Sequence, residues 1–561
     1  MKKIMKSLLL MAAVTTGMMG FVSCSSDDDL PKADALFRPV ITESGNIEHF
    51  LDDNLVPYMT VKWDNYTAAN QYIVKMEAID GNDVREITTD SIGCTFTNLK
   101  YDTEYTLSLT AANTVTGLSS KPFSLNTTTL DYPTKLSSVS STDLIDTQAR
   151  IKWSGVAYDS LQIWKDSNDS LVTTIVLTDA DNEALNAIVR NLQPKTTYRV
   201  LAFVNDQYLG KKKFTTTAAE DFGDDAVIDL RGLTADESKK YITSAVIAAD
   251  IEANPGKDIT YVLQGGVQYT ISDVKFPTCP NRIKFVTGLT LAGNAEFISS
   301  AAMTAVTGSE IEALEFEKID FYAGNGLEDV LNNTDMKFGS KQVFNLADGI
   351  AATIGSISFK SCTMTYYRAI VRAQDGSANA KTFNAVTFDD CVLNGVGDQG
   401  VVTTSNKKGD SFKDVTFNNC TLTNIYVLSD FRANAASNPT MTFNNCTLCY
   451  AGRSGNQLMN HGSTAITLKI KNTLFGPALN NSKAYTAGET GKLLAGTATS
   501  VSAENSYMTT YEWNVDNLLD GVKDLGMTET ELWKAPADGD FTIIGKYADD
   551  DLTKLGDARW W

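Results

Sequence analysis

The chain has 561 residues, 43% of them hydrophobic, and carries a formal net charge of −20 at pH 7 with only two histidines. This length predicts three or four domains, and the ordinary hydrophobic content excludes a wholly disordered chain. The negative charge argues against nucleic-acid binding, and two histidines leave little material for a His-built zinc site or a Ser/His/Asp triad.

The first residues have the features of an export signal. Three lysines precede the apolar run 7–22, which is short for a membrane span. The run is followed by Ser23 and Cys24, a pair that resembles the lipobox of bacterial lipoproteins. The resemblance implies that residues 1–23 are removed as a lipoprotein signal peptide and that Cys24 is lipidated. The alternative is secretion with an unmodified cysteine.

Residues 24–32 form a serine-containing, acidic linker. Such a run directly after the lipidated cysteine resembles the surface-export signal of lipoproteins in glycan-degrading Gram-negative gut anaerobes. The resemblance implies a lipid-anchored protein of the outer membrane that faces the cell exterior. Removal of the three signal-peptide lysines makes the chain more acidic still, so an acidic partner would need a local concentration of basic groups.

Residues 33–129 and 130–217 contain the same landmarks in the same order. In each segment a tryptophan follows a short alternating strand, and a Leu-x5-Tyr motif comes later. The two residues are Trp63 and Tyr105 in the first segment, and Trp153 and Tyr198 in the second. The pattern resembles two fibronectin type III domains, in which the tryptophan fills the sandwich core and the tyrosine forms a corner. We therefore expect these rings to be buried rather than to bind sugar.

Residues 218–561 show a different repeat, apolar-polar-Phe-polar-polar-Cys. It recurs at intervals of 26 to 29 residues and ends in Cys362, Cys391, Cys420 and Cys446. Alternation buries the Phe, and the two polar residues form a corner in which Asn tolerates left-handed backbone. This resembles the right-handed parallel β-helix of pectate-lyase-like proteins. A predicted helix, residues 236–254, would cap its amino-terminal end.

We interpret the four repeat cysteines as a ladder of small buried side chains in the solenoid core. A disulfide between neighbouring coils is the alternative, because export favours disulfides. A zinc site is not expected, since stacked positions form a line rather than a tetrahedron. The sequence therefore predicts mainly β structure: two fibronectin type III-like sandwiches followed by a parallel β-helix without a metal site.

The chain ends in Gly556-Asp557-Ala558-Arg559-Trp560-Trp561. A Gly-Asp-Pro-Arg-Trp ending resembles the carboxyl end of a family of uncharacterised bacterial surface lipoproteins. In that family fibronectin type III-like modules precede a pectate-lyase-like β-helix, and the genes accompany glycan-uptake machinery. The order of segments agrees along the whole chain, with Ala558 standing where the family has proline. The resemblance implies glycan-uptake proteins as partners.

Outward side chains of successive solenoid strands form rows. On the second strand of each coil, an apolar pair precedes the polar residues. If Leu428 and Met459 are equivalent members of this pair, Asp430 lies beside His461. The candidate glycan-binding or catalytic residues on this face are Arg372, Asp375, Lys407, Asp430, Arg432, Asn460 and His461. Three nearby rings are candidates for sugar stacking: Tyr366, Tyr426 and Tyr450.

These residues favour non-catalytic or weakly catalytic capture of a polysaccharide, such as a pectic glycan, along a groove of the β-helix, with no cofactor required. The first alternative is a polysaccharide lyase that acts on an acidic, pectin-like glycan by β-elimination, where Arg372, Arg432 or His461 is the base and Ca²⁺ binds the uronate. The second alternative is a structural or adhesive surface protein without glycan affinity.

Overall fold

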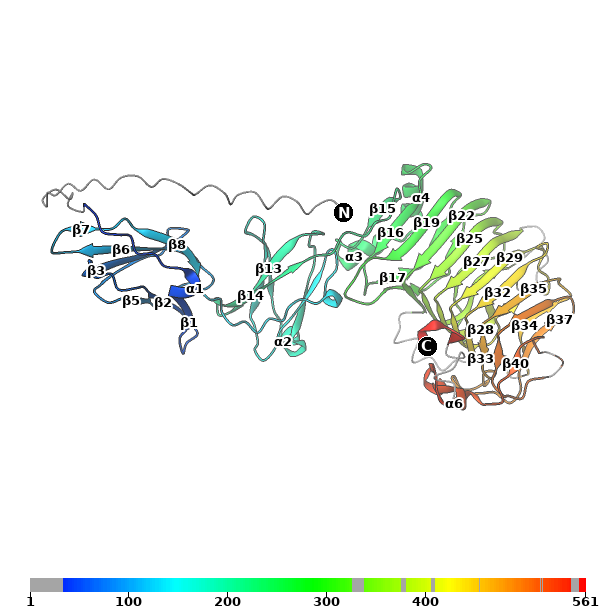
Figure 1. The fold of residues 1–561 in the computed structure, drawn as a ribbon. Coiled ribbons are helices and arrows are strands. Elements are labelled where there is room, and N and C mark those ends of the chain that lie inside the picture. The colour runs from blue at the N-terminus through cyan, green and yellow to red at the C-terminus, as the bar shows by residue number, and fades with distance from the viewer. Residues whose placement is uncertain are drawn as a thin grey trace, which may run out of the picture. The chain divides into compact units, whose positions relative to one another are not determined.

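The computed structural model describes residues 34–324, 338–374, 380–404, 409–453, 455–514, 516, 518–545 and 554–561 (Figure 1). The signal peptide, Cys24 and the whole acidic linker lie outside the described residues, as do Asp375 and Lys407. The protein is mainly β, as expected. No helix among the described residues is both long enough and apolar enough to cross a membrane.

The first sandwich has two antiparallel sheets. One contains β1 (Ile47–Leu51), β2 (Pro57–Lys62) and β5 (Gly93–Phe96); the other contains β3 (Gln71–Ala78), β4 (Val84–Thr89), β6 (Glu104–Asn113), β7 (Leu118–Ser119) and β8 (Phe123–Thr128). A short helix, α1 (Glu43–Asn46), precedes β1. Trp63 and Tyr105 are buried between the sheets, and the Tyr105 hydroxyl accepts a hydrogen bond from the Lys100 amide at 3.4 Å. The predicted tyrosine corner is confirmed.

The second sandwich repeats this arrangement. Its sheets contain β9 (Ala149–Lys152) and β12 (Asn186–Val189) on one side, and β10 (Ser160–Lys165), β11 (Ser170–Val176), β13 (Thr197–Val204) and β14 (Gln207–Thr215) on the other, with η1 (Ser141–Asp143) and α2 (Asp179–Ala184) in the connections. Trp153 and Tyr198 are buried, and the Gln193 amide donates to the Tyr198 hydroxyl at 2.8 Å. Both sandwiches are therefore fibronectin type III-like.

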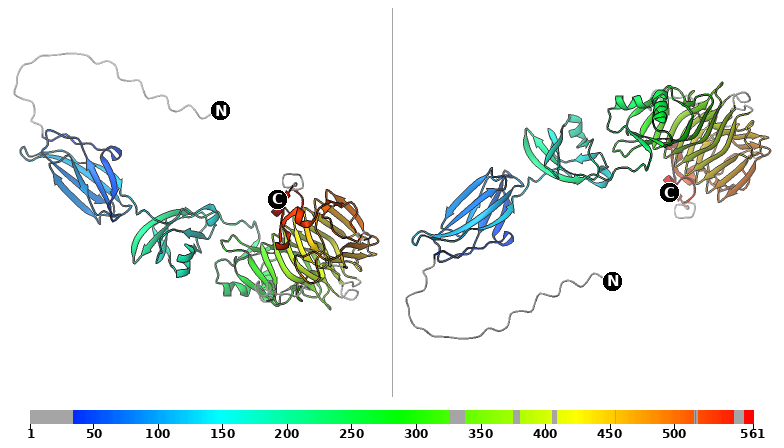
Figure 2. Two further views of the ribbon diagram at one scale, coloured as in Figure 1. Left: turned by 90° about the horizontal axis from the view of Figure 1, so that it is seen from below. Right: turned by 90° about the horizontal axis from the view of Figure 1, so that it is seen from above.

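The remaining chain is a parallel β-solenoid of about nine turns (Figures 1 and 2). Its first sheet is entirely parallel and has ten strands: β15 (Ala226–Asp229), β16 (Ile259–Leu263), β19 (Cys279–Thr287), β22 (Ser309–Glu317), β25 (Ala352–Lys360), β27 (Lys381–Asp389), β29 (Ser411–Asn418), β32 (Thr440–Asn444), β35 (Thr467–Lys471) and β38 (Ser500–Glu504). The predicted β-helix is confirmed.

The second solenoid sheet divides into two arms. The first arm contains β17 (Gln268–Ile271), β20 (Ala295–Ser299), β23 (Ile319–Ala323), β26 (Thr363–Ala373), β28 (Val392–Thr403), β30 (Thr421–Ile425), β33 (Thr447–Ala451), β36 (Leu474–Phe475), β39 (Tyr507–Met508) and β40 (Lys523–Asp524). The second arm joins β24 (Gln342–Leu346) through the far ends of β26 and β28 to β31 (Ser429–Asp430), β34 (Gln457–Gly462) and β37 (Lys492–Gly496). The strands β26 and β28 belong to both arms.

Smaller elements complete the solenoid. The strands β18 (Lys275–Phe276) and β21 (Thr304–Ala305) form a separate pair, and the carboxyl-terminal segment contains α6 (Glu529–Leu532), β41 (Trp533–Ala535), η4 (Pro536–Asp538), β42 (Asp540–Ile543) and η7 (Ala558–Trp560). The predicted helix 236–254 is three pieces: α3 (Ala235–Ser238), η2 (Lys239–Tyr241) and α4 (Ser244–Ala253). Ile242 and Ile247 enter the core, and α4 lies at the amino-terminal end of the solenoid (Figure 2).

Aromatic rings fill the solenoid core as a stack. Phe359, Phe388, Phe417 and Phe443 occupy the same position in successive coils, and their ring centroids are 4.9 to 5.2 Å apart. This spacing matches the separation of parallel strands, about 4.8 Å, because equivalent residues lie in register. The Phe repeat therefore sets the registration of the coils.

The corner after each Phe has left-handed backbone. Asp390, Asn419, Asn445 and Asn472 have φ between 50° and 54°. Their side chains hydrogen-bond from coil to coil, for example from Asn419 Nδ2 to Asp390 Oδ1 at 3.1 Å. This confirms the predicted role of asparagine at the corner, since its short amide tolerates this conformation and bonds locally.

The cysteine ladder lies directly after these corners. The side chains of Cys362, Cys391, Cys420 and Cys446 are buried free thiols. Each sulfur lies near backbone carbonyls; Cys420 Sγ is 3.1 Å from the oxygen of Asn418 and 3.5 Å from that of Phe388. Burial raises the pKa of the Cys362 and Cys420 thiols. These groups therefore serve as small, neutral core side chains.

Candidate functional site

Five side chains form a continuous row across β24, β26, β28, β31 and β34. The strand register pairs Asn345 with Arg372, Arg372 with Thr403, Thr403 with Asp430, and Asp430 with Asn460. Adjacent strands lie about 4.8 Å apart, so this polar row extends roughly 19 Å. The structure therefore brings together three of the predicted residues, Arg372, Asp430 and Asn460.

Asp430 is held by a guanidinium fork. Arg432 donates from Nε to Oδ1 at 2.9 Å and from Nη2 to Oδ2 at 2.6 Å. The side chain of Arg432 is 43% exposed and that of Asp430 is 18% exposed. The paired carboxylate raises the pKa of Arg432. Because both Asp430 oxygens are occupied, this carboxylate is poorly suited to act as a base or as a metal ligand.

Two arginines lie on the same face of β26. Arg368 donates to Asp398 at 2.8 Å and 3.3 Å, and Arg372 is half-buried four residues later. Burial lowers the pKa of Arg372, and the neighbouring charge of Arg368 lowers it further. A carboxylate from a bound ligand would favour the charged form of this arginine.

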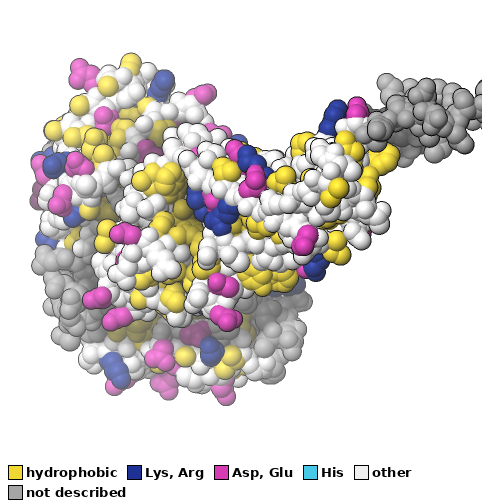
Figure 3. Space-filling view, turned by 90° about the vertical axis from the view of Figure 1, so that its left-hand side faces the viewer, with side chains coloured by type: hydrophobic (Ala, Val, Ile, Leu, Met, Phe, Trp, Pro, Cys, Tyr) yellow, Lys and Arg dark blue, Asp and Glu magenta, His cyan; other side chains and the backbone are white. Residues whose placement is uncertain are grey.

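The amino-terminal end of the polar row has an unsatisfied acceptor. Asn345 Oδ1 is inaccessible to solvent and accepts no hydrogen bond within the described part of the chain. A buried polar atom of this kind is costly unless a partner binds it. Basic and acidic side chains are interspersed over the face of the molecule in Figure 3. The polar row itself combines one arginine and one aspartate with neutral side chains; Thr403 is fully buried, and the other four members are partly exposed.

The expected outward position of His461 is wrong. Its side chain is fully buried, with Nε2 3.1 Å from Ser429 Oγ and Nδ1 3.2 Å from Thr499 Oγ1. The ring stacks on Phe431 with centroids 5.9 Å apart. Asn460, and not His461, pairs with Asp430, so the alignment was displaced by one residue at this coil. Such a displacement exchanges the two faces of a strand.

We expect His461 to make the solenoid sensitive to acid. Burial lowers its pKa from 6.5 to about 4, so the folded state holds a neutral ring while the unfolded chain binds a proton below about pH 6.5. Stability is therefore lost as the pH falls from about 6.5 to about 4, by about 3 kcal/mol in all. Urea denaturation at several pH values should show this loss for the wild type and a smaller one for His461→Gln. Equal pH dependence in the two proteins would contradict the assignment.

The predicted sugar-stacking rings lie mostly in a second apolar core. Tyr450 and Tyr426 are 2% and 3% exposed, and Tyr366 is half-buried against Phe338. The Tyr426 hydroxyl donates to the carbonyl of Asn481 at 3.2 Å. Residues of the carboxyl-terminal segment, including Trp533 and Phe541, pack in the same cluster. Tyr426 and Tyr450 are therefore structural, and the prediction that they stack on sugars is wrong.

The comparisons with known proteins inform only the sandwiches. No family model and no curated protein matches the chain. A two-domain fibronectin type III segment of chicken tenascin is similar over 31% of this chain and 99% of its own, with 17% identity and a TM-score of 0.16. The FN1–FN3 domains of chicken CNTN1 match 28% of this chain and 60% of their own, with 17% identity and a TM-score of 0.13.

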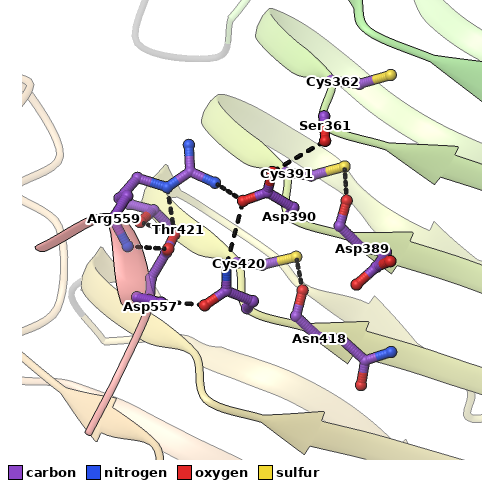
Figure 4. Close-up of polar contacts among 12 residues, drawn as sticks. Ser361, Cys362, Asp389, Asp390, Cys391, Asn418, Cys420, Thr421, Asp557 and Arg559 are labelled. Carbon is purple, nitrogen blue, oxygen red and sulfur yellow. Dashed lines mark hydrogen bonds and ion pairs between the residues drawn. The ribbon is translucent and has the colours of Figure 1, made fainter. Parts of the chain in front are cut away.

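The carboxyl-terminal motif is a latch onto the solenoid corners (Figure 4). Asp557 is fully buried and accepts hydrogen bonds from Thr421 Oγ1 and Arg559 Nε, both at 2.6 Å. Arg559 Nη2 also donates to Asp390 at 3.0 Å, and the Ala558 amide donates to Asn419 Oδ1 at 2.6 Å. The motif therefore binds to the corner residues Asp390 and Asn419, a structural role that the sequence alone did not assign.

The described residues contain no group of three or more His, Cys, Asp or Glu side chains able to hold a metal ion. Asp398 and Asp430 are each bound to an arginine, and Asp348 is a further acid whose charge acts on Arg372. The calcium of the lyase alternative thus has no fitting ligand set among these residues. The contribution of Asp375 and Lys407 lies outside the described residues.

Proposed function

We propose that the protein is a cell-surface lipoprotein that binds an acidic polysaccharide along the polar row, as part of a glycan-uptake system. The observation that carries this proposal is the register of Asn345, Arg372, Thr403, Asp430 and Asn460 across five neighbouring strands. The lipobox-like sequence at Cys24 supports anchoring to the outer membrane. Two sandwiches between the anchor and the solenoid would act as spacers.

The chemistry of the polar row suits a sugar polymer. The side-chain amide of Asn460 can donate to and accept from sugar hydroxyls, and a guanidinium such as that of Arg372 can donate two parallel hydrogen bonds to a uronate carboxylate. A regular row along the solenoid presents these groups to an extended chain, so capture of a polymer is favoured over capture of a small molecule.

A lyase is the second candidate, and one observation favours it. A general base must lose its proton before it can act, and burial together with Arg368 lowers the pKa of Arg372. Elimination also requires neutralisation of the uronate carboxylate, for which the described residues offer arginines but no acidic cluster for calcium. We therefore place catalysis second to binding.

The proposal predicts that Arg372→Ala weakens retention on pectic glycans by about tenfold or more, because a charged hydrogen bond to a carboxylate is lost. Asn460→Ala should have a smaller effect. Affinity electrophoresis of the mature chain in gels that contain pectic or neutral polysaccharides measures both. Lys469→Ala, which removes an exposed cation from the other solenoid sheet, is the matched control.

Three results would reject the binding proposal. Retention that is unchanged in Arg372→Ala and Asn460→Ala would remove the polar row from the binding surface. An unsaturated product that absorbs in the ultraviolet after incubation with the glycan would establish the lyase. Absence of retention on every glycan would favour a structural or adhesive surface protein.

A further inference from the structure

The first arm of the second sheet carries a pair of carboxylates in the early coils. Glu296 on β20 is the register partner of Asp320 on β23. Two residues further along the same strands, Ile298 is the partner of Tyr322. Residues two apart on a strand share one face, and neighbouring strands lie about 4.8 Å apart. The two acids and the tyrosine therefore face the same side of the sheet.

Neither acid is neutralised by a basic group among the described residues. Within the described part of the chain no lysine, arginine or histidine forms an ion pair with Glu296 or Asp320. Glu296 Oε2 is buried and has no hydrogen-bond partner there. Asp320 accepts a bond of 3.3 Å from Asn294, and burial raises its pKa. Like charges on register partners of adjacent strands are unfavourable, and a cation bound to both carboxylates would remove that cost.

A third acceptor lies beside the pair. Tyr322 is only 8% exposed, and its hydroxyl forms no hydrogen bond within the described residues. Burial raises its pKa to about 12, and the charges of Asp320 and Glu296 contribute to this rise. The hydroxyl is therefore within the field of both carboxylates. Ile298 and Tyr366 pack with the Tyr322 ring and form an apolar side to the cluster.

We propose that Glu296, Asp320 and Tyr322 bind a protonated primary amine carried by an amino sugar. An ammonium group has three N–H donors, and the cluster offers two carboxylates and one hydroxyl oxygen as acceptors. The Tyr322 ring is almost fully buried against Ile298 and Tyr366, so it contributes its hydroxyl to the cluster rather than an exposed ring face. Naming a sugar rests on the proposed glycan-binding function, whereas the recognition of an amine does not.

A divalent cation fits the cluster less well. Calcium takes six to eight oxygen ligands, whereas the cluster provides two carboxylates and few neutral oxygens. The described residues contain no third acidic, histidine or cysteine side chain placed to complete a metal site. An ammonium ion needs only the three acceptors present, so the amine is the better occupant.

Isothermal titration calorimetry of the mature chain tests this assignment. A β-1,4-linked glucosamine oligomer should bind at least about tenfold more tightly than its N-acetylated counterpart, which has the same ring but no charge. The double variant Glu296→Gln, Asp320→Asn should lose this difference. Tyr322→Phe, which keeps the ring, should weaken binding of the amine several-fold. Asp389→Asn, which alters a half-buried acid of the other sheet, is the control and should change nothing.

The stability of the ligand-free variants provides a second readout. Glu296→Gln and Asp320→Asn should leave Tm unchanged or raise it, because they remove an unneutralised charge. A lower Tm would identify the acids as structural and overturn the proposal. Equal affinity for the two oligomers would do so too, as would calcium binding that the double variant abolishes.

The amine-binding proposal and the proposal of glycan binding along the polar row can be rejected independently. If the glucosamine oligomer does not bind while pectic glycans are still retained, only the amine assignment is rejected. If no polysaccharide is retained but the glucosamine monomer binds the wild type and not the double variant, the amine site stands and the proposed glycan capture along the polar row is rejected.

Discussion

Asp557→Ala is expected to lower the free energy of unfolding of the solenoid by about 3 kcal/mol, the size seen when one member of a buried ion pair is removed. The substitution leaves the Arg559 guanidinium and the Thr421 hydroxyl without their shared acceptor. Arg559 is 27% exposed and retains Asp390, so water and this second carboxylate limit the loss. Urea denaturation of the mature chain measures the effect.

Local unfolding should accompany this loss of stability. The latch fixes the end of the segment that contains β41 and β42, and these strands cover the apolar cluster around Tyr450. Hydrogen exchange in residues 529–543 should therefore accelerate in Asp557→Ala more than exchange in the central strands. The control is Asp538→Ala, an exposed acid of the same segment, which should have almost no effect. Equal protection of the segment in wild type and Asp557→Ala would contradict the latch.

A milder change tests the geometry of the latch. The Ala558 amide donates to Asn419 at 2.6 Å, and a proline at this position has no N–H to donate. Ala558→Pro, which gives the ending Gly-Asp-Pro-Arg-Trp, should cost about 1 kcal/mol if its ring fits the local backbone. The Asn419 side chain would then keep its bond to Asp390.

The periodic part of the architecture could be predicted because one residue type marks each position. Phe388, Phe417 and Phe443 recur with a cysteine three residues later, and both positions are buried as expected. Interior positions of a solenoid are filled by stacking of equivalent side chains, so their identity repeats in the sequence. The corner asparagines were predictable for the same reason.

The polar row was predicted less accurately because surface positions have no such constraint. At the coil of Asp430 the apolar pair was taken as Val427 and Leu428, but Ser429 occupies the register position opposite Val402. A buried serine that hydrogen-bonds to His461 breaks the apolar pattern. Because of this one-residue error, Asp430 and His461 were assigned to the same row. Asp430 lies on the outer face as predicted, whereas His461 lies on the inner face.

Two features were not predicted from the repeat pattern, for different reasons. They are the burial of the tyrosines and the pair of acids, Glu296 and Asp320. Tyr450 packs with Tyr485 and shares its cluster with Trp533 and Phe541 of the carboxyl-terminal segment, and no repeating pattern connects these residues. The acid pair did leave a signal: Glu296 precedes Phe297 and Asp320 precedes Phe321, each after a small or apolar residue. Alternation places both acids outward, and comparison of the two strands would have found them side by side.

Phe417→Ala is expected to cost about 3 to 5 kcal/mol, the range for removal of a fully buried aromatic ring. The Phe417 ring lies between Phe388 at 4.9 Å and Phe443 at 5.0 Å, with interplanar angles of 4° and 3°. Its removal leaves a cavity that both neighbouring coils border. In a solenoid each coil is stabilised chiefly by the adjacent ones, so two interfaces are weakened together. Urea denaturation provides the measurement.

Two further variants separate packing from polarity at this coil. Phe417→Leu fills much of the volume and should cost clearly less than Phe417→Ala, about 1.5 kcal/mol. Thr416→Ala alters the outward neighbour on β29 and should change stability by less than about 0.5 kcal/mol. If Phe417→Ala cost no more than Thr416→Ala, the ring stack would not be what holds successive coils in register. In that case the corner hydrogen bonds between Asp390, Asn419 and their neighbours would have to carry the registration alone.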